Sequence, residues 1–236
     1  MLASGGAWRA VAAAAGERWT APDLPGHGAA PNWIGGDYMA DALAVAVRHA
    51  PAGPFDLVGH SYGGCLALRL LVDMPERVRS LALIEPVMFA AGDPATVAAH
   101  FDEMAPHADA LRGGHREDAA RIFTALWGDG RPWKALKSSQ RVYIADRIHL
   151  ITASEPGIAS DAHGILTRLP ADPPPVLLVT RRDPPPVVAS IAHDLAARLP
   201  GTARTEIGRG HMIPMEAPEA LADRLCAFWN EADPAL

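Results

Sequence analysis

Short apolar runs alternate with longer segments of helical periodicity at both ends of the chain. Runs of this length predict buried strands at 55–58, 80–84, 176–179 and 203–207. Apolar residues that recur every three to four positions predict helices at 8–15, 37–49, 62–74, 187–199 and 218–229. A further strand is expected at 18–23. Strands that alternate with helices indicate an α/β fold, with a mostly parallel sheet covered by helices on both faces.

The alternation stops in the middle of the chain. Between residues 87 and 172 no segment has a convincing strand pattern, whereas helical patterns are clear at 96–111, 117–127 and 140–152. We therefore expect a core formed by residues 1–86 and 173–236, interrupted by a helical insertion at 87–172.

The segment around Ser61 carries the clearest chemical signal. Gly59-His60-Ser61-Tyr62-Gly63 fits the pattern G-x-S-x-G and lies between a predicted strand and a predicted helix. A sharp turn at this point strains the backbone of Ser61 and lifts its hydroxyl clear of the sheet. We expect Gly59 and Gly63 to allow close approach of strand and helix, and the N–H of Tyr62 to face a developing oxyanion. The plainer alternative is a serine that only caps the helix.

The segment Val58 to Gly64 resembles the nucleophile elbow of the α/β-hydrolase fold. Two more segments resemble the same family: the turn Asp23-Leu24-Pro25-Gly26-His27-Gly28, and the loop Gly208-Arg209-Gly210-His211-Met212 with the helix that follows it. The insertion at 87–172 resembles the family's helical cap. The resemblance implies a carboxylesterase-like serine hydrolase, without a cofactor, that acts on a small-molecule ester, lactone or thioester. Haloalkane dehalogenases resemble this chain too, but they carry Asp at the elbow.

The resemblance also implies strands that precede the first helix seen here. Met1 to Trp8 looks like the loop that follows a His-Gly turn, and that turn supplies a second oxyanion donor in the family. We therefore expect the natural gene product to be longer at its N-terminus. A chain without these strands has an alternative role as a catalytically impaired or non-catalytic binding protein on the same scaffold.

The mechanism implied by the family needs a base and an acid beside Ser61. His211, in a Gly-flanked loop after the last strand, is the expected general base. A carboxylate must orient its ring. Asp183 follows the strand at 176–179, the usual place for the acid in this family, and is preferred. Glu85 follows the strand at 80–84, where some branches place their acid, and is the alternative.

Aromatic and histidine residues of the insertion and the turns need separate interpretation. Met88, Phe89, Trp127 and Trp133 are candidates for the wall of a substrate pocket, whereas most other aromatic residues of the insertion are expected to form its own core. His27 and His60 lie in motif turns, where local hydrogen bonds are the simpler expectation than catalysis. The remaining histidines have no spacing typical of a metal site.

Composition and charge limit the classes of partner that this protein is expected to bind. The formal net charge is −6 and no basic block is present, which argues against nucleic acid. No apolar run approaches the length of a membrane span, and no secretory signal is visible. The two cysteines, Cys65 and Cys226, are expected to be buried thiols in a reducing compartment. The sequence predicts a cytoplasmic enzyme with a small-molecule substrate, no metal and no membrane contact.

Overall fold

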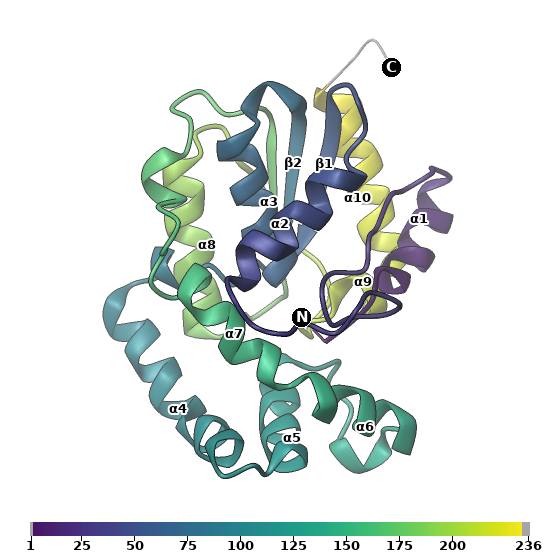
Figure 1. Cartoon of the computed structure of the whole chain (residues 1–236). Coiled ribbons are helices and arrows are strands. Elements are labelled where there is room, and N and C mark those ends of the chain that lie inside the picture. Colours follow the sequence, from purple (N-terminus) through teal and green to yellow (C-terminus); the bar gives the residue numbers. More distant parts are fainter. Residues whose placement is uncertain (1, 233–236) are drawn as a thin grey trace.

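Four parallel strands form the sheet of this protein, whose computed structural model describes residues 2–232. The strands lie side by side in chain order: β1 (Phe55–His60), β2 (Val78–Ile84), β3 (Val176–Thr180) and β4 (Ala203–Glu206). In this sheet β1 and β4 are the edges, and β2 and β3 are buried between them (Figure 1). The predicted α/β class with a parallel sheet is confirmed.

Helices cover both faces of the sheet because its central strands are apolar on both sides. Leu81 and Leu83 face one hydrophobic cluster, whereas Ala82 and Ile84 face another. This alternation follows from the period of two in a strand. The first cluster packs against α2 (Tyr38–His49), α3 (Tyr62–Asp73) and α8 (Pro186–Arg198), and the second against α1 (Arg9–Ala15) and α10 (Pro218–Ala232).

One expected strand, at 18–23, is wrong: this segment is irregular. It lies across a groove of about 800 Å³ from β1, so its backbone does not pair with that strand. Its end is instead held by Asp23, whose carboxylate accepts hydrogen bonds from the N–H of Gly5 (2.7 Å) and of Ala29 (2.8 Å).

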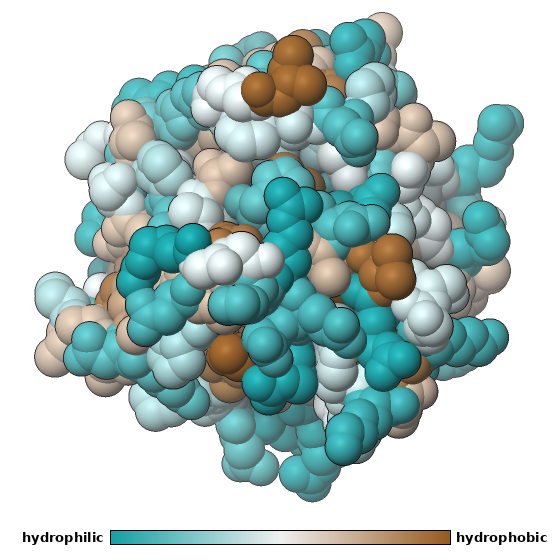
Figure 2. All heavy atoms as spheres, turned by 60° about the horizontal axis from the view of Figure 1, so that its bottom comes forward, coloured by the Kyte–Doolittle hydropathy of each residue, from teal (hydrophilic) through white to brown (hydrophobic). Residues whose placement is uncertain are grey.

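Between residues 87 and 172 the regular elements are all helical, with irregular segments between them. The predicted helix at 140–152 is two helices that meet at Ile148. The helices are α4 (Pro94–Arg112), α5 (Arg116–Trp127), α6 (Ser138–Arg147) and α7 (His149–Ile158), which gather at one end of the sheet (Figure 1). Figure 2 shows that the face turned outward there is mostly hydrophilic, with hydrophobic residues as separate spots.

Short elements complete the chain. They are α9 (Ile213–Glu216) and the 3-10 turns η1 (Gly5–Trp8), η2 (Pro75–Arg77), η3 (Phe89–Ala91), η4 (Trp133–Ala135) and η5 (Leu166–Arg168). Across residues 2–232, no helix is both long and apolar enough to cross a bilayer.

The turn from β1 to α3 depends on one glycine more than on its neighbour. A Cβ added at Gly59 would lie 2.3 Å from the carbonyl oxygen of Gly63, whereas a Cβ at Gly63 would meet nothing within 4 Å. The expectation that both glycines allow close approach is therefore correct only for Gly59. Gly64 provides the other close contact, since a Cβ there would lie 3.0 Å from Pro86.

We predict opposite effects of alanine at the two positions. Gly59→Ala should lower the free energy of unfolding by about 1–3 kcal/mol, because the backbone of the turn must move to admit the methyl group. Gly63→Ala should leave it unchanged or raise it slightly, since alanine favours the helix more than glycine does. Urea unfolding of both variants measures the difference; equal losses would contradict the packing described here.

Candidate active site

Ser61 lies at the turn between β1 and α3, in a backbone conformation that side chains rarely adopt. Its φ is +56° and its ψ is −123°. A residue other than glycine holds such angles only where the surrounding structure imposes them, and such sites are commonly functional. Ser61 occupies the N-cap position of α3, but its hydroxyl makes no capping hydrogen bond. The side chain is therefore not used as a cap.

Hydrogen bonds between neighbouring strand ends bring the site together. The N–H of Ser61 donates to the carbonyl oxygen of Ile84 (2.9 Å), and the N–H of Glu85 donates to that of Val179 (2.8 Å). The first residue after β1 is thus bonded to the last residue of β2, and the first residue after β2 is bonded to β3 near its end. The carboxyl ends of parallel strands meet at one edge of the sheet, which is where α/β proteins bind ligands.

His211 reaches this edge from the loop after β4. The loop is held by the carboxylate of Glu216, which accepts hydrogen bonds from the N–H groups of Arg209 and Gly210, both 2.7 Å. His60, at the end of β1, donates through Nε2 to the carbonyl oxygen of His211 (2.7 Å). The loop is therefore fixed on both sides of the histidine ring.

Glu85 is the carboxylate that contacts His211. Its Oε2 lies 3.2 Å from Nδ1 of His211, and the two side chains are 0% and 3% exposed. A carboxylate can only accept here, so Nδ1 carries the proton and Nε2 of the neutral ring is left free to accept one. Among the described residues, no hydrogen bond joins the Ser61 hydroxyl to this ring, and a catalytic bond of that kind is often long before substrate binds.

Arg181, directly after β3, binds the same carboxylate. Its backbone N–H donates to Oε1 of Glu85 (2.7 Å) and its Nε donates to Oε2 (2.8 Å). Nη2 lies 2.7 Å from Oε2 but at an angle that gives no hydrogen bond, so it contributes charge alone. Both side chains of this ion pair are buried.

The charges around Glu85 and His211 shift their pKa values in a consistent way. Burial acts to raise the pKa of Glu85, but the bonds from His211 and Arg181 outweigh it and hold that pKa below its usual value. Burial lowers the pKa of His211, Glu85 opposes the change, and Arg181 adds to it, with a lowered pKa as the result. The pair is thus an ionised carboxylate and a neutral imidazole near pH 7.

Asp183, the preferred acid from the sequence, is not brought to His211. Its side chain is 91% exposed and lies 3.6 Å from Nη1 of Arg209, itself 75% exposed. The chain turns into solvent within two residues of Arg181, at a φ of +51° for Asp183. Glu85, the alternative from the sequence, holds the position instead because it directly follows β2, next to the strand that carries Ser61.

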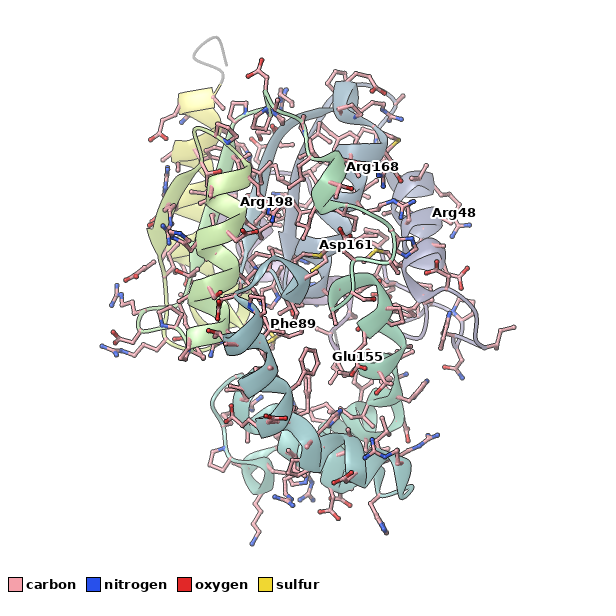
Figure 3. The ribbon with its side chains drawn as sticks, turned by 90° about the vertical axis from the view of Figure 1, so that its left-hand side faces the viewer. Arg48, Phe89, Glu155, Asp161, Arg168 and Arg198 are labelled. Carbon is pink, nitrogen blue, oxygen red and sulfur yellow. The ribbon has the colours of Figure 1, made fainter. Side chains whose placement is uncertain are left out.

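The pocket candidates divide into two groups. Trp127 packs edge-on to His211, with ring centroids 4.9 Å apart, and Phe89 packs against Trp127 at 6.1 Å. Figure 3 shows Phe89 where the insertion joins the core. Met88 is fully buried in the main hydrophobic cluster. Trp133 packs on a separate cluster inside the insertion and borders an outer pocket of about 670 Å³, away from Ser61.

Comparison with known proteins gives the family. A model described as "Alpha/beta hydrolase family" matches residues 1–224, which is nearly the whole chain. The chain belongs to the alpha/beta hydrolase family. It is 36% identical over 115 residues to "Lipase LipV" of Mycobacterium tuberculosis, a match that covers 48% of this chain and 42% of the lipase. The chain thus spans less than half of that relative's length.

Two further similar proteins extend the comparison. A "Pimeloyl-[acyl-carrier protein] methyl ester esterase" of Neisseria meningitidis is 44% identical over 64 residues, which cover 27% of this chain and 24% of the esterase. The crystal structure of a haloalkane dehalogenase loop variant from Bradyrhizobium elkanii superposes with a TM-score of 0.70 at 17% identity, covering 99% of this chain and 87% of that one. At this identity the superposition shows the fold alone.

The remaining sequence expectations at the candidate site concern backbone donors and metals. Tyr62 is the first residue of α3, so its N–H has no partner within the helix. His27 lies 3.0 Å from the carbonyl oxygen of Pro25, which is a local contact, and also accepts from the N–H of Leu2, 25 positions away. Within residues 2–232, no group of three or more His, Cys, Asp or Glu side chains is arranged to hold a metal ion.

Two residues of the site escaped the sequence analysis. The sequence does not single out Arg181, because its contact with Glu85 joins residues 96 positions apart. His60 was expected to bond locally, but its partner His211 lies 151 positions away. The available signal was the position of both residues at the carboxyl end of a strand, which places them at the same edge of the sheet.

We predict that the protein loses stability as the pH falls from about 7 to 5. Burial lowers the pKa of His60 and His211, and lowers that of His27 to about 4. In the unfolded chain each ring takes a proton near pH 6.5, whereas the folded state excludes it, so acid favours unfolding. Urea unfolding at several pH values measures the slope.

Two variants test the source of this slope. His27→Gln should make it shallower, and the exposed His49→Gln should leave it unchanged. A free energy of unfolding that is constant between about pH 7 and pH 5 would contradict the assignment of neutral buried rings.

Proposed function

We propose that this chain is a serine hydrolase that cleaves a small-molecule ester, lactone or thioester through an acyl-enzyme on Ser61. The observation that carries the proposal is the strained turn at Ser61, which follows β1, next to the buried Glu85–His211 pair at the end of the adjacent strand β2. The lipase and esterase among the relatives support the class of reaction.

The first half of the reaction forms the acyl-enzyme. The Ser61 hydroxyl attacks the substrate carbonyl while Nε2 of His211 takes its proton. The N–H of Tyr62, at the N-terminus of α3, donates to the oxyanion that develops. Glu85 holds the His211 ring in the required tautomer and stabilises its charged form. His211 then returns the proton to the leaving alcohol or thiol.

The second half releases the acid. Water gives a proton to Nε2 of His211 as it attacks the acyl carbon. The tetrahedral intermediate then collapses, the bond between the acyl carbon and Oγ of Ser61 breaks, and His211 returns the proton to Oγ. No cofactor enters these steps. Trp127 and Phe89, from the insertion and its junction with the core, are the residues we assign to the wall that faces the acyl group.

The alternative is a binding protein on the same scaffold. The absence of a hydrogen bond between the Ser61 hydroxyl and the His211 ring, in the described part of the chain, is the observation that favours it. A fluorophosphonate separates the two proposals, because only an activated serine reacts with it.

We propose the cytoplasm as the compartment of this protein, on the basis of the free thiols of Cys65 and Cys226.

We predict that Ser61→Ala abolishes fluorophosphonate labelling and lowers the hydrolysis of p-nitrophenyl esters by about 10⁴-fold or more, since the nucleophile is removed. Esters of rising chain length identify the preferred acyl group. The unfolding midpoint should stay close to that of the wild type, which serves as the control for folding. Full activity of this variant would exclude an acyl-enzyme on Ser61.

We predict a sharp contrast between two carboxylates. Glu85→Gln should lower kcat by about 10⁴-fold, because glutamine neither orients nor stabilises the His211 ring as a carboxylate does. Asp183→Asn, the matched change at the exposed position, should stay within about threefold of the wild type, since surface substitutions rarely matter. Steady-state ester hydrolysis compares them. The reverse order would return the role of the acid to Asp183.

A further inference from the structure

Arg181 and His211 both contact the carboxylate of Glu85, and the side chain of Arg181 is buried. Its side chain is 7% exposed, and the Glu85 side chain is 0% exposed. The two donors from Arg181 occupy one lone pair on each oxygen of the carboxylate. These bonds set the plane of the carboxylate and leave Oε2 directed at Nδ1 of His211.

We propose that Arg181 is a positioning residue for the hydrolase reaction, which aims the Glu85 carboxylate at His211 and keeps it charged. The inference rests on the proposed function of Ser61, His211 and Glu85. Arg181 has no direct contact with the reacting atoms in this scheme. It acts through Glu85, whose orientation determines which nitrogen of His211 is available to Ser61.

The positive charge of Arg181 also affects the protonation of Glu85 and His211. A carboxylate buried without a cation takes up a proton, because burial disfavours its ionised form. A protonated Glu85 would no longer stabilise the imidazolium that forms during the reaction. The guanidinium 2.7 Å away favours the ionised form and, by its charge, disfavours protonation of the resting His211 ring. Arg181 therefore keeps both partners in the protonation states that the reaction needs.

The ends of all four strands contribute residues to the cluster around Glu85. His60 ends β1, Glu85 follows β2, Arg181 follows β3 and His211 follows β4. The insertion closes the cluster with Trp127, whose ring lies 5.9 Å from the guanidinium carbon and 4.9 Å from the His211 ring centroid. His60, the other titratable group here, is buried and has a lowered pKa from burial and from His211, so it remains neutral.

Neutral and charged variants of Arg181 test the proposal. Arg181→Met should lower kcat about 10–100-fold, the usual effect of losing a group that orients a catalytic side chain, with little change in KM. It should also move the acid limb of the kcat/KM profile upward by about one pH unit, because the cation that favours ionised Glu85 is gone. A merely structural role would not move this limb. Arg182→Met, at the exposed neighbouring position, is the matched control and should keep the wild-type profile.

Two more variants keep the test decisive. Arg181→Gln, neutral but able to donate, should show the same upward shift and replaces Arg181→Met if that variant does not fold. Arg181→Lys should retain the acid limb, because it keeps the charge, and recover only part of the rate, because lysine has no Nε–H to place on Oε2. If neither neutral variant folds, Arg181→Lys decides the proposal, and a wild-type kcat in it overturns the positioning role.

Fluorophosphonate labelling of the wild type tests the proposed function separately from the role of Arg181. A wild type that is neither labelled nor able to hydrolyse p-nitrophenyl esters overturns the proposed function and, with it, the role of Arg181. A labelled and active wild type, together with an unchanged pH profile in folded Arg181→Met, overturns the role of Arg181 alone. The double variant Arg181→Met with Glu85→Gln should be no slower than Glu85→Gln, since one residue acts through the other.

Discussion

A buried carboxylate, that of Glu85, is the constraint on which the rest of the site depends. Taking a charge out of water is costly unless cations and donors surround it. Here the donors come from two distant parts of the chain, Arg181 after β3 and His211 after β4. These contacts require the ends of β2, β3 and β4 to lie together, so the site depends on the order and register of the strands.

The parallel order of the strands makes this meeting possible. Because β1, β2, β3 and β4 lie side by side in chain order, each crossover helix returns the chain to the same edge. Backbone hydrogen bonds then join the turn after one strand to the end of its neighbour or to the loop that follows it: the N–H of Ser61 donates to the carbonyl oxygen of Ile84, and the N–H of Arg182 to that of Gly208 (3.0 Å). These links fix the positions of the turns without using the side chains of the candidate site.

The insertion changes the electrostatics of the site rather than its connectivity. Trp127 lies over Arg181 and against His211, and Phe89 and His100 pack behind it. Aromatic side chains exclude water from this end of the sheet, and charged contacts are stronger where water is excluded. The lowered pKa of His211 has burial as its first cause, which includes this cover.

Local pattern determined most of the fold. The strands and helices of the core follow from apolar runs and helical periodicity, and the Ser61 turn follows from its place between β1 and α3, because these features depend on neighbours in sequence. The segment at 18–23 did not form a strand, since pairing depends on a partner that the local pattern does not specify.

Only the tertiary structure shows which of the two candidate acids contacts His211. Asp183 and Glu85 both follow a strand, and nothing near either residue tells which one is buried. The difference lies in contacts across 96 and 126 positions, from Arg181 and His211 to Glu85. The same holds for Arg181 and for Trp127, whose roles come from what the folded chain places beside them. The sequence thus singles out Ser61 and His211 as candidates, and three-dimensional packing shows which carboxylate lies against His211.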